Sequence, residues 1–240
     1  MSWIGWAIPG SGHCSRRRGG GGSSNGRCTD RRDDLRARMT ARGPWRFWSS
    51  CSGVLLRPRR TITSISSSAT IADGFAAASM FGCLYGLAAL LAHARGREPR
   101  GRLPTFIPSR RHYLWQSVYT LPVSLAWMAL LGGFARQLSK RLGGKGTFAS
   151  DFTMLAFTQS MPMIALFWLP DVVCYLLGID GPSYERLVVV YGPAAVTWAA
   201  VLSTAGISTT ERIAWPKSLV VVILSEIASA VASGTAIVIR

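Results

Sequence analysis

Five apolar stretches, each about as long as a membrane-spanning helix, follow one another through the second part of the chain. They cover residues 71–92, 114–134, 152–177, 187–207 and 218–239. An α-helix rises 1.5 Å per residue, so about 20 apolar residues cross the ~30 Å hydrocarbon layer of a bilayer. The pattern therefore predicts an all-α fold, a polytopic transmembrane helical bundle with five spans.

The third stretch is too long for one perpendicular crossing. Pro162 and Pro170 interrupt it, and proline removes an amide donor and clashes with the preceding helical turn. We expect residues 152–169 to span the membrane and residues 171–177 to tilt or to lie along the interface. Tryptophan and tyrosine near the ends of the stretches, at Tyr113, Trp115, Trp168 and Trp215, are typical of the membrane interface.

The composition agrees with a membrane protein. Apolar residues make up 49% of the 240 residues and charged residues only 16%, against about 25% charged in a soluble domain, and the mean hydropathy is +0.25. The five cysteines have no paired spacing, which speaks against a disulfide framework or a metal site. We predict no metal and no cofactor.

Residues 1–38 differ from the rest of the chain. They hold eight arginines and a run of glycines at 19–22, without the aromatic or glycine-spaced repeats that favour nucleic-acid binding. We interpret them as a disordered or mis-started extension, with a solvated cytoplasmic tail as the alternative. Residues 39–68 form a basic juxtamembrane segment that suits an anionic cytoplasmic membrane surface, and residues 69–240 form the membrane domain.

The loop charges give the predicted orientation. With the N-terminus inside, the cytoplasmic cations from Met39 onward number eleven, five before the first stretch, four in 135–151 and two in 208–217. The outside cations number eight, six in 93–113 together with Arg186 and Arg240. The positive-inside rule therefore favours a cytoplasmic N-terminus.

Small residues mark the faces by which the spans are expected to associate, because lipid tails give helices no hydrophobic reason to pack together. They repeat every four residues in the first and fifth stretches. These faces serve packing within the bundle or self-association between copies. The positions are Gly74, Ala78, Gly82 and Gly86 in the first stretch, and Ser225, Ser229 and Ser233 in the fifth, with a second stripe at Ala228, Ala232 and Ala236.

Three acids, Asp73, Asp171 and Glu226, lie in or beside the apolar stretches, where a charge costs on the order of 3 kcal/mol. Asp73 and Asp171 are close enough to the ends of their stretches for an N-cap or interfacial role. Glu226 lies roughly 12 Å inside the fifth stretch by helical rise. It is interpreted either as a polar clamp to a neighbouring helix or as a group that moves protons or cations.

A glycine-rich loop connects the second and third stretches. It has Ser139 and Gly146 where a Walker loop needs glycine and a hydroxyl residue, so phosphate binding of that kind is excluded. We interpret it as a tight turn with snorkelling cations, or as a surface that contacts a partner or lipid. Its candidate residues are Lys140, Arg141, Gly143, Gly144, Lys145 and Gly146.

Several motifs of the middle region occur in a familiar order. They are Tyr113-Leu114-Trp115-Gln116, Leu121-Pro122, the loop from Leu142 to Phe148, Pro162, and Trp168-Leu169-Pro170-Asp171. This order resembles the prokaryotic branch of the Yip family, five-span membrane proteins named for eukaryotic relatives that interact with Ypt/Rab GTPases. The eukaryotic Asp-Leu-Tyr-Gly-Pro type motif has no counterpart before the first stretch, so Rab binding is not carried over.

The resemblance implies a cytoplasmic N-terminus and a role in membrane organisation or partner binding, without catalysis. We therefore expect a non-enzymatic scaffold in the cell membrane whose partners are the bilayer, other membrane proteins or a second copy, and not nucleic acid. The alternative is a small transporter or channel that uses Glu226 and the proline-broken third stretch.

Overall fold

The computed structural model describes residues 44–96, 111–179 and 181–238. The chain divides into two units, Met1–Arg42 and Gly43–Arg240, and all described residues belong to the second. The predicted extension 1–38 lies outside them. The elements in chain order are α2 (Pro44–Leu56), α3 (Pro58–Ser68), α4 (Ile71–Ala94), α5 (His112–Arg141), α6 (Phe148–Met163), the π-helical turn η2 (Ile164–Trp168), α7 (Leu169–Leu176), α8 (Gly181–Glu211) and α9 (Trp215–Val238).

The predicted fold class is confirmed, since the described residues form helices and no strand. Five segments are long and apolar enough to cross a membrane, and they coincide with the five predicted stretches. Their bounds are Ile71–Ala94, His112–Arg141, Phe148–Leu176, Arg186–Glu211 and Trp215–Ser233. Large apolar side chains such as Val118, Val189 and Val190 point outward, as lipid-facing residues do.

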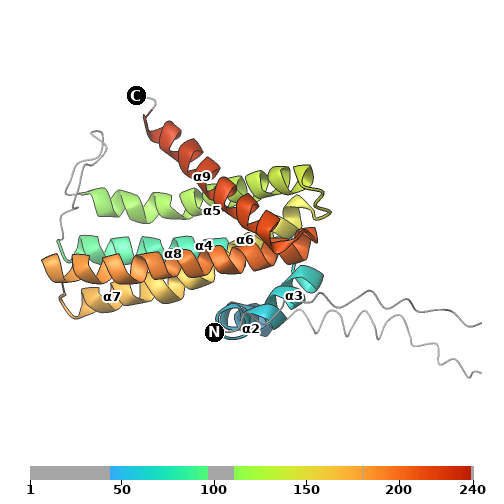
Figure 1. Cartoon of the computed structure of the whole chain (residues 1–240). Helices are drawn as coiled ribbons and strands as arrows, with labels where there is room; N and C mark the ends of the chain where they lie inside the picture. Colours follow the sequence, from blue (N-terminus) through green and yellow to red (C-terminus); the bar gives the residue numbers. More distant parts are fainter. Residues whose placement is uncertain (1–43, 97–110, 180, 239–240) are drawn as a thin grey trace, which may run out of the picture. The chain divides into compact units, whose positions relative to one another are not determined.

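Successive spans run in opposite directions (Figure 1). One end of the bundle carries the start of α4, the end of α5, the start of α6, the end of α8 and the start of α9. We call it the loop end, because it holds the α5–α6 connection at residues 142–147 and the α8–α9 connection at residues 212–214.

The helix α6 forms the centre of the bundle. Every residue from Asp151 to Pro162 is buried, and α4, α5 and α8 all pack against this helix. Its interior surface is partly polar, and the Thr158 hydroxyl lies 3.0 Å from that of Ser203 on α8. Small and polar side chains thus bring the neighbouring helices close to α6.

We expected residues 152–169 to span and residues 171–177 to tilt or to lie along the interface; the structure shows that the helix is not broken at the prolines. The chain continues from α6 through η2 into α7 as one segment, Phe148–Leu176. A π-helical turn accommodates a missing backbone donor without ending the helix. The indole nitrogen of Trp168 donates a hydrogen bond to the Leu84 carbonyl at 2.8 Å, which fixes this turn against α4.

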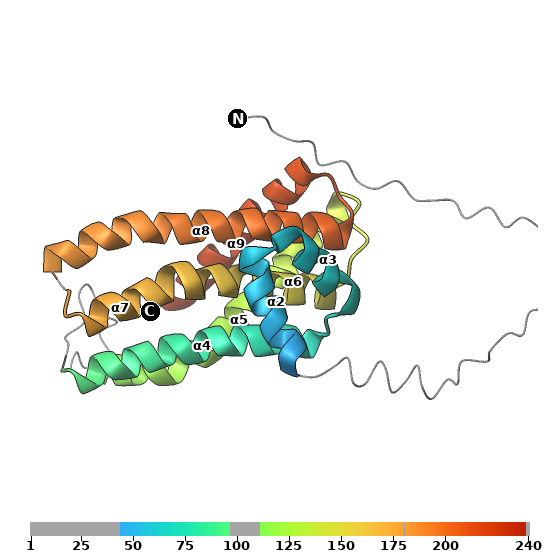
Figure 2. The ribbon, with the colours of Figure 1, turned by 90° about the horizontal axis from the view of Figure 1, so that it is seen from below.

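The basic segment before the first span folds into a helical hairpin, α2 and α3. Figure 2 shows α2 lying across the bundle between α4 and α8, with its inner face on α6 and with α3 on α8. The Phe47 ring lies 5.6 Å from that of Phe157, and Val54 is fully buried. Burial raises the pKa of the Cys51 thiol to about 12, so this thiol stays protonated and unreactive at neutral pH.

The glycine stripe of α4 faces α5 and α6. Gly74, Ala78, Gly82 and Gly86 are all buried. A Cβ atom added at Gly82 would lie 2.9 Å from the Leu121 Cα atom, whereas one added at Gly133 on α5 would meet nothing within 4 Å. The backbones of α4 and α5 therefore approach closely at Gly82.

We predict that Gly82→Ala destabilises the bundle by about 1–3 kcal/mol, because the added methyl group overpacks the helix contact. Gly133→Ala is the matched control, and it should be neutral or stabilising by up to about 1 kcal/mol through helix propensity. Thermal unfolding of the purified variants in detergent measures both. Equal stability of the two variants would contradict the close contact.

Candidate functional site

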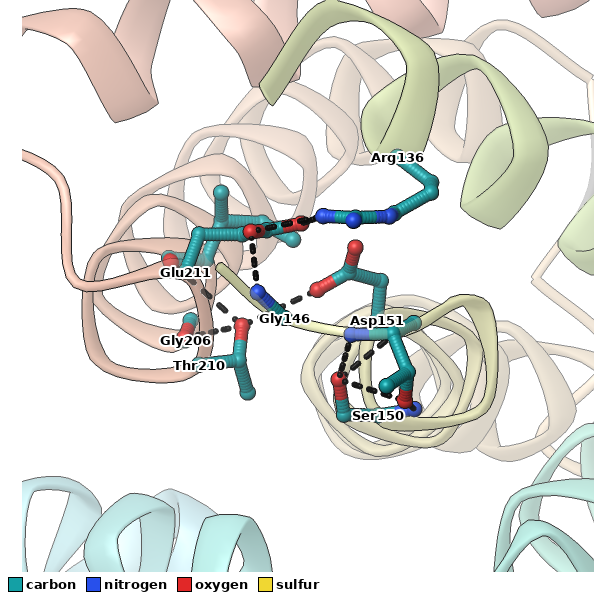
Figure 3. A network of polar contacts seen from close by, with 9 residues as sticks. Arg136, Gly146, Ser150, Asp151, Gly206, Thr210 and Glu211 are labelled. Carbon is teal, nitrogen blue, oxygen red and sulfur yellow. Dashed lines mark hydrogen bonds and ion pairs between the residues drawn. The ribbon is translucent and has the colours of Figure 1, made fainter. Parts of the chain in front are cut away.

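A buried carboxylate at the loop end organises the main polar cluster of the described chain. Glu211 is the last residue of α8, and its side chain is 0% exposed. The guanidinium of Arg136 on α5 donates to both carboxylate oxygens, at 2.8 and 3.0 Å. The Gly146 amide donates to Oε2 at 2.6 Å. Figure 3 shows Glu211 held between Arg136 and the loop.

The α5–α6 loop is folded around this carboxylate. The Lys145 amide donates to the main-chain oxygen of Glu211 at 3.2 Å. A Cβ atom at Gly144 would lie 3.0 Å from the Glu211 Cδ atom, and one at Gly146 would lie 2.9 Å from it. Gly143 has a φ of +89°, which glycine adopts without strain. The glycines thus allow the turn and the close approach to Glu211.

A second carboxyl group joins the cluster from α6. Asp151 is 0% exposed, and its Oδ1 accepts a hydrogen bond of 3.1 Å from the Thr210 hydroxyl. Its Oδ2 is buried and has no hydrogen-bond partner among the described residues. Figure 3 shows the Asp151 carboxyl group close to Arg136 and Thr210. We call Arg136, Asp151, Thr210 and Glu211 the buried cluster.

The cluster is enclosed and joins three spans. Glu211 and Asp151 are wholly buried, and the Arg136 side chain is 24% exposed. Breaking a buried ion pair leaves an uncompensated charge, so the cluster holds the ends of α5, α6 and α8 together. Within the described part of the chain, no three His, Cys, Asp or Glu side chains form a group that could hold a metal ion.

The predicted loop cations lie at the protein surface, close in sequence to the residues of this cluster. Lys140, Arg141 and Lys145 are all exposed. We call these three residues the cationic loop surface. Lys140 and Arg141 lie in the last turn of α5. Lys145 lies in the loop that follows, whose backbone is held by Glu211 and by the hydrogen bond from the Gly144 amide to the Ser139 carbonyl, 2.8 Å long.

The three predicted acidic positions lie apart from the cluster and from one another. Asp73 is the third residue of a capping box at the start of α4, where its carboxylate accepts from the Thr70 amide at 2.7 Å. Asp171 accepts hydrogen bonds from the hydroxyls of Tyr184 and Tyr191 on α8. Glu226 accepts from the Gln159 side-chain amide. The structure therefore gives each of these acids a local partner.

The serine stripe of α9 differs in its degree of burial along the helix. Ser225 and Ser229 are fully buried, and their hydroxyls have no hydrogen-bond partner among the described residues. Ser233 is half-buried and donates to the Ser229 carbonyl at 2.7 Å.

Sequence reasoning missed Arg136, Asp151 and Glu211. They fell in or beside segments interpreted as loops, where charged residues need no partner. Two features of the sequence together could have indicated the cluster. A single acid follows the fourth apolar stretch, and a loop with three glycines follows the second, where glycines indicate a close backbone approach.

We predict that Arg136→Gln lowers the stability of the protein by about 3 kcal/mol or more, because it leaves the Glu211 carboxylate buried without its cation. The matched control is Arg141→Gln, which removes an exposed cation one helical turn or so away and should change stability by less than about 0.5 kcal/mol. Thermal unfolding in detergent measures the difference.

The double variant Arg136→Gln/Glu211→Gln sharpens this test. Its loss of stability should be smaller than the sum of the two single losses. Each single variant already loses the Arg136–Glu211 interaction, so the sum includes this loss twice. Strict additivity would show that the two side chains do not stabilise each other.

A known family model matches most of the chain. The family model described as the Yip1 domain matches residues 52–237, which include the buried cluster, the glycine loop and all five spans. Searches of curated proteins and of solved structures gave no match. Because the matched region covers most of the chain, the protein belongs to the Yip1 domain family of multi-pass membrane proteins.

Proposed function

We propose that this protein is a non-enzymatic membrane scaffold that binds another membrane protein, or a second copy of itself, through the cationic loop surface. The observation that supports this function is the clamping of the glycine loop onto Glu211. A loop held in one conformation presents its charges in a fixed pattern, and such preorganisation lowers the entropy lost on binding.

The charge at the loop end is suited to an acidic partner surface. Glu211 is paired with Arg136, so its negative charge is already compensated and does not offset the exposed cations. Lys140, Arg141 and Lys145 all face outward. Complementary charge then selects partners and accelerates their encounter.

We place the loop end on the cytoplasmic side of the cell membrane. The cation count of the loops supports this orientation, and so does the resemblance to the Yip family. On that side the cationic loop surface also faces anionic lipid, at about 1 kcal/mol of attraction per cation.

We predict that a photocrosslinker at the exposed position Leu142 yields a crosslinked protein adduct in intact membranes. The triple change Lys140→Gln/Arg141→Gln/Lys145→Gln should abolish this adduct, because it removes the charges that the partner recognises. The matched control Arg57→Gln/Arg59→Gln/Arg60→Gln removes three cations at the start of α3, Arg57 being its N-cap, and should retain the adduct. Loss in both triple variants, or adducts with lipid only, would contradict a partner at this loop.

A specific arrangement also favours the second candidate function, a proton or cation pathway. Glu226 and Gln159 contact each other inside the bundle, and Ser160, Ser225 and Ser229 carry buried hydroxyls without a partner among the described residues. Acids within a span mark ion pathways when they line a polar route.

We favour the scaffold over the pathway. The Glu226 carboxyl group accepts a hydrogen bond from Gln159 on a neighbouring helix, and a carboxyl group bonded in this way acts as a structural clamp between the two helices. We expect no proton or cation flux above background in liposomes that contain the full chain. Glu226→Gln should then leave flux unchanged and lower stability by about 1–2 kcal/mol. Flux that disappears in Glu226→Gln would establish the transporter instead.

A further inference from the structure

A surface cavity of about 460 Å³, open to solvent, lies along α2 and α3, and both of its arginines are exposed. This volume falls within the range of small-ligand sites. The lining is formed by two arginines, five hydroxyl residues, one glycine and one leucine. These residues are Ser49, Ser50, Ser52, Gly53, Leu56, Arg57, Arg60, Thr61 and Ser64.

The cavity carries positive charge that the described residues do not neutralise. No described carboxylate lies within ion-pair distance of Arg57 or Arg60. The hydroxyls of Thr61 and Ser64 donate to no described acceptor. Guanidinium groups and hydroxyl donors together match the oxygens of a phosphate group, which arginine binds in bidentate fashion.

The start of α3 adds to this preference for an anion. Pro58 occupies the beginning of the helix, no side chain caps it, and no acidic residue lies in its first turn. The amide groups at a helix N-terminus carry partial positive charge and favour a bound anion. Arg57 is the N-cap of α3 and Arg60 lies in its first turn, so both arginines stand at this end of the helix.

The hairpin is anchored so that the cavity keeps its shape. Arg46 near the start of α2 donates to the Ser68 hydroxyl at the end of α3, 2.8 Å away. At the other end the Arg57 amide donates to the Gly53 carbonyl at 2.8 Å, which continues the hydrogen-bond pattern of α2 into the turn. A Cβ atom at Gly53 would meet the Thr61 side chain, so the two helices approach closely there.

The position of the hairpin is that of an interfacial helix pair. Since α2 lies across the spans (Figure 2), a membrane crossed by the spans has α2 near its plane. Trp45 and Trp48 are 81% and 56% exposed, and exposed tryptophan is typical of the headgroup layer. These exposed tryptophans support a position of the basic, hydroxyl-rich cavity near the headgroup layer.

We propose that the α2–α3 cavity binds a phosphate group presented by an anionic lipid headgroup, with Arg57 and Arg60 as its main ligands. This site shares no residue with the cationic loop surface, so it does not depend on the proposed partner binding. It gives the chain a lipid-recognition element at the start of its membrane domain.

The test measures binding of dioctanoyl phosphatidic acid to the full chain in zwitterionic detergent by isothermal titration calorimetry. Dioctanoyl phosphatidylcholine, which lacks net negative charge, is the control ligand. We expect saturable binding of the phosphatidic acid that weakens by about tenfold or more in Arg57→Gln/Arg60→Gln. The equally charged control variant Arg212→Gln/Lys217→Gln removes two exposed cations outside both proposed surfaces and should bind as the unmodified chain does.

A second variant tests the cavity without a change of charge. Ser64→Leu places an apolar side chain in the lining and should also weaken binding, while circular dichroism reports whether the helices remain intact. Titration with inorganic phosphate separates the two sources of the ligand. Binding of phosphate alone supports a free-anion site, and binding only of the phosphatidic acid supports a lipid site.

The proposal is overturned by any of three results. The first is an absence of saturable binding to both phosphate ligands. The second is unchanged affinity in the arginine double variant. The third is an equal loss in Arg212→Gln/Lys217→Gln, which would show general charge attraction and not a defined site.

Discussion

The burial of one carboxylate sets the arrangement of the loop end. An ionised group taken out of water costs several kcal/mol unless cations and hydrogen-bond donors replace its hydration. Glu211 meets this demand with Arg136 from α5 and the Gly146 amide from the loop. Each partner belongs to a different part of the chain, so satisfying this one group fixes where α5 ends, how the loop turns and where α8 stops.

The rest of the bundle is held by close approach. Lipid does not drive helices together, so short side chains that let backbones touch must supply the attraction. This is why α6, which is surrounded by α4, α5 and α8, carries threonine and serine in its interior. It is also why Gly74 of α4 lies against Thr153 and Phe152. Charge fixes one end of the bundle, and packing of small residues continues along its length.

The five spans and the α4 stripe could be predicted because hydropathy over 20 residues and a four-residue spacing are local properties. The cluster could not, since Arg136 and Glu211 are 75 residues apart and each by itself resembles a solvated loop charge. The α2–α3 hairpin was missed for a related reason. Its apolar residues Val54, Ile62 and Ile65 are too few to stand out beside the arginines, and only their joint burial reveals the face. The π-helical turn depends on how neighbouring helices hold the prolines.

The cluster also changes which charges bear on orientation. The cation count treated Arg136 as a free loop charge, yet its guanidinium is paired with Glu211, so it adds little to the surface potential at the loop end. Arg57 and Arg60, by contrast, are exposed and held by a folded hairpin, as are the cations of the loop. Because attraction to anionic lipid falls off within about a Debye length, these exposed cations contribute more to the surface potential than the paired Arg136 does.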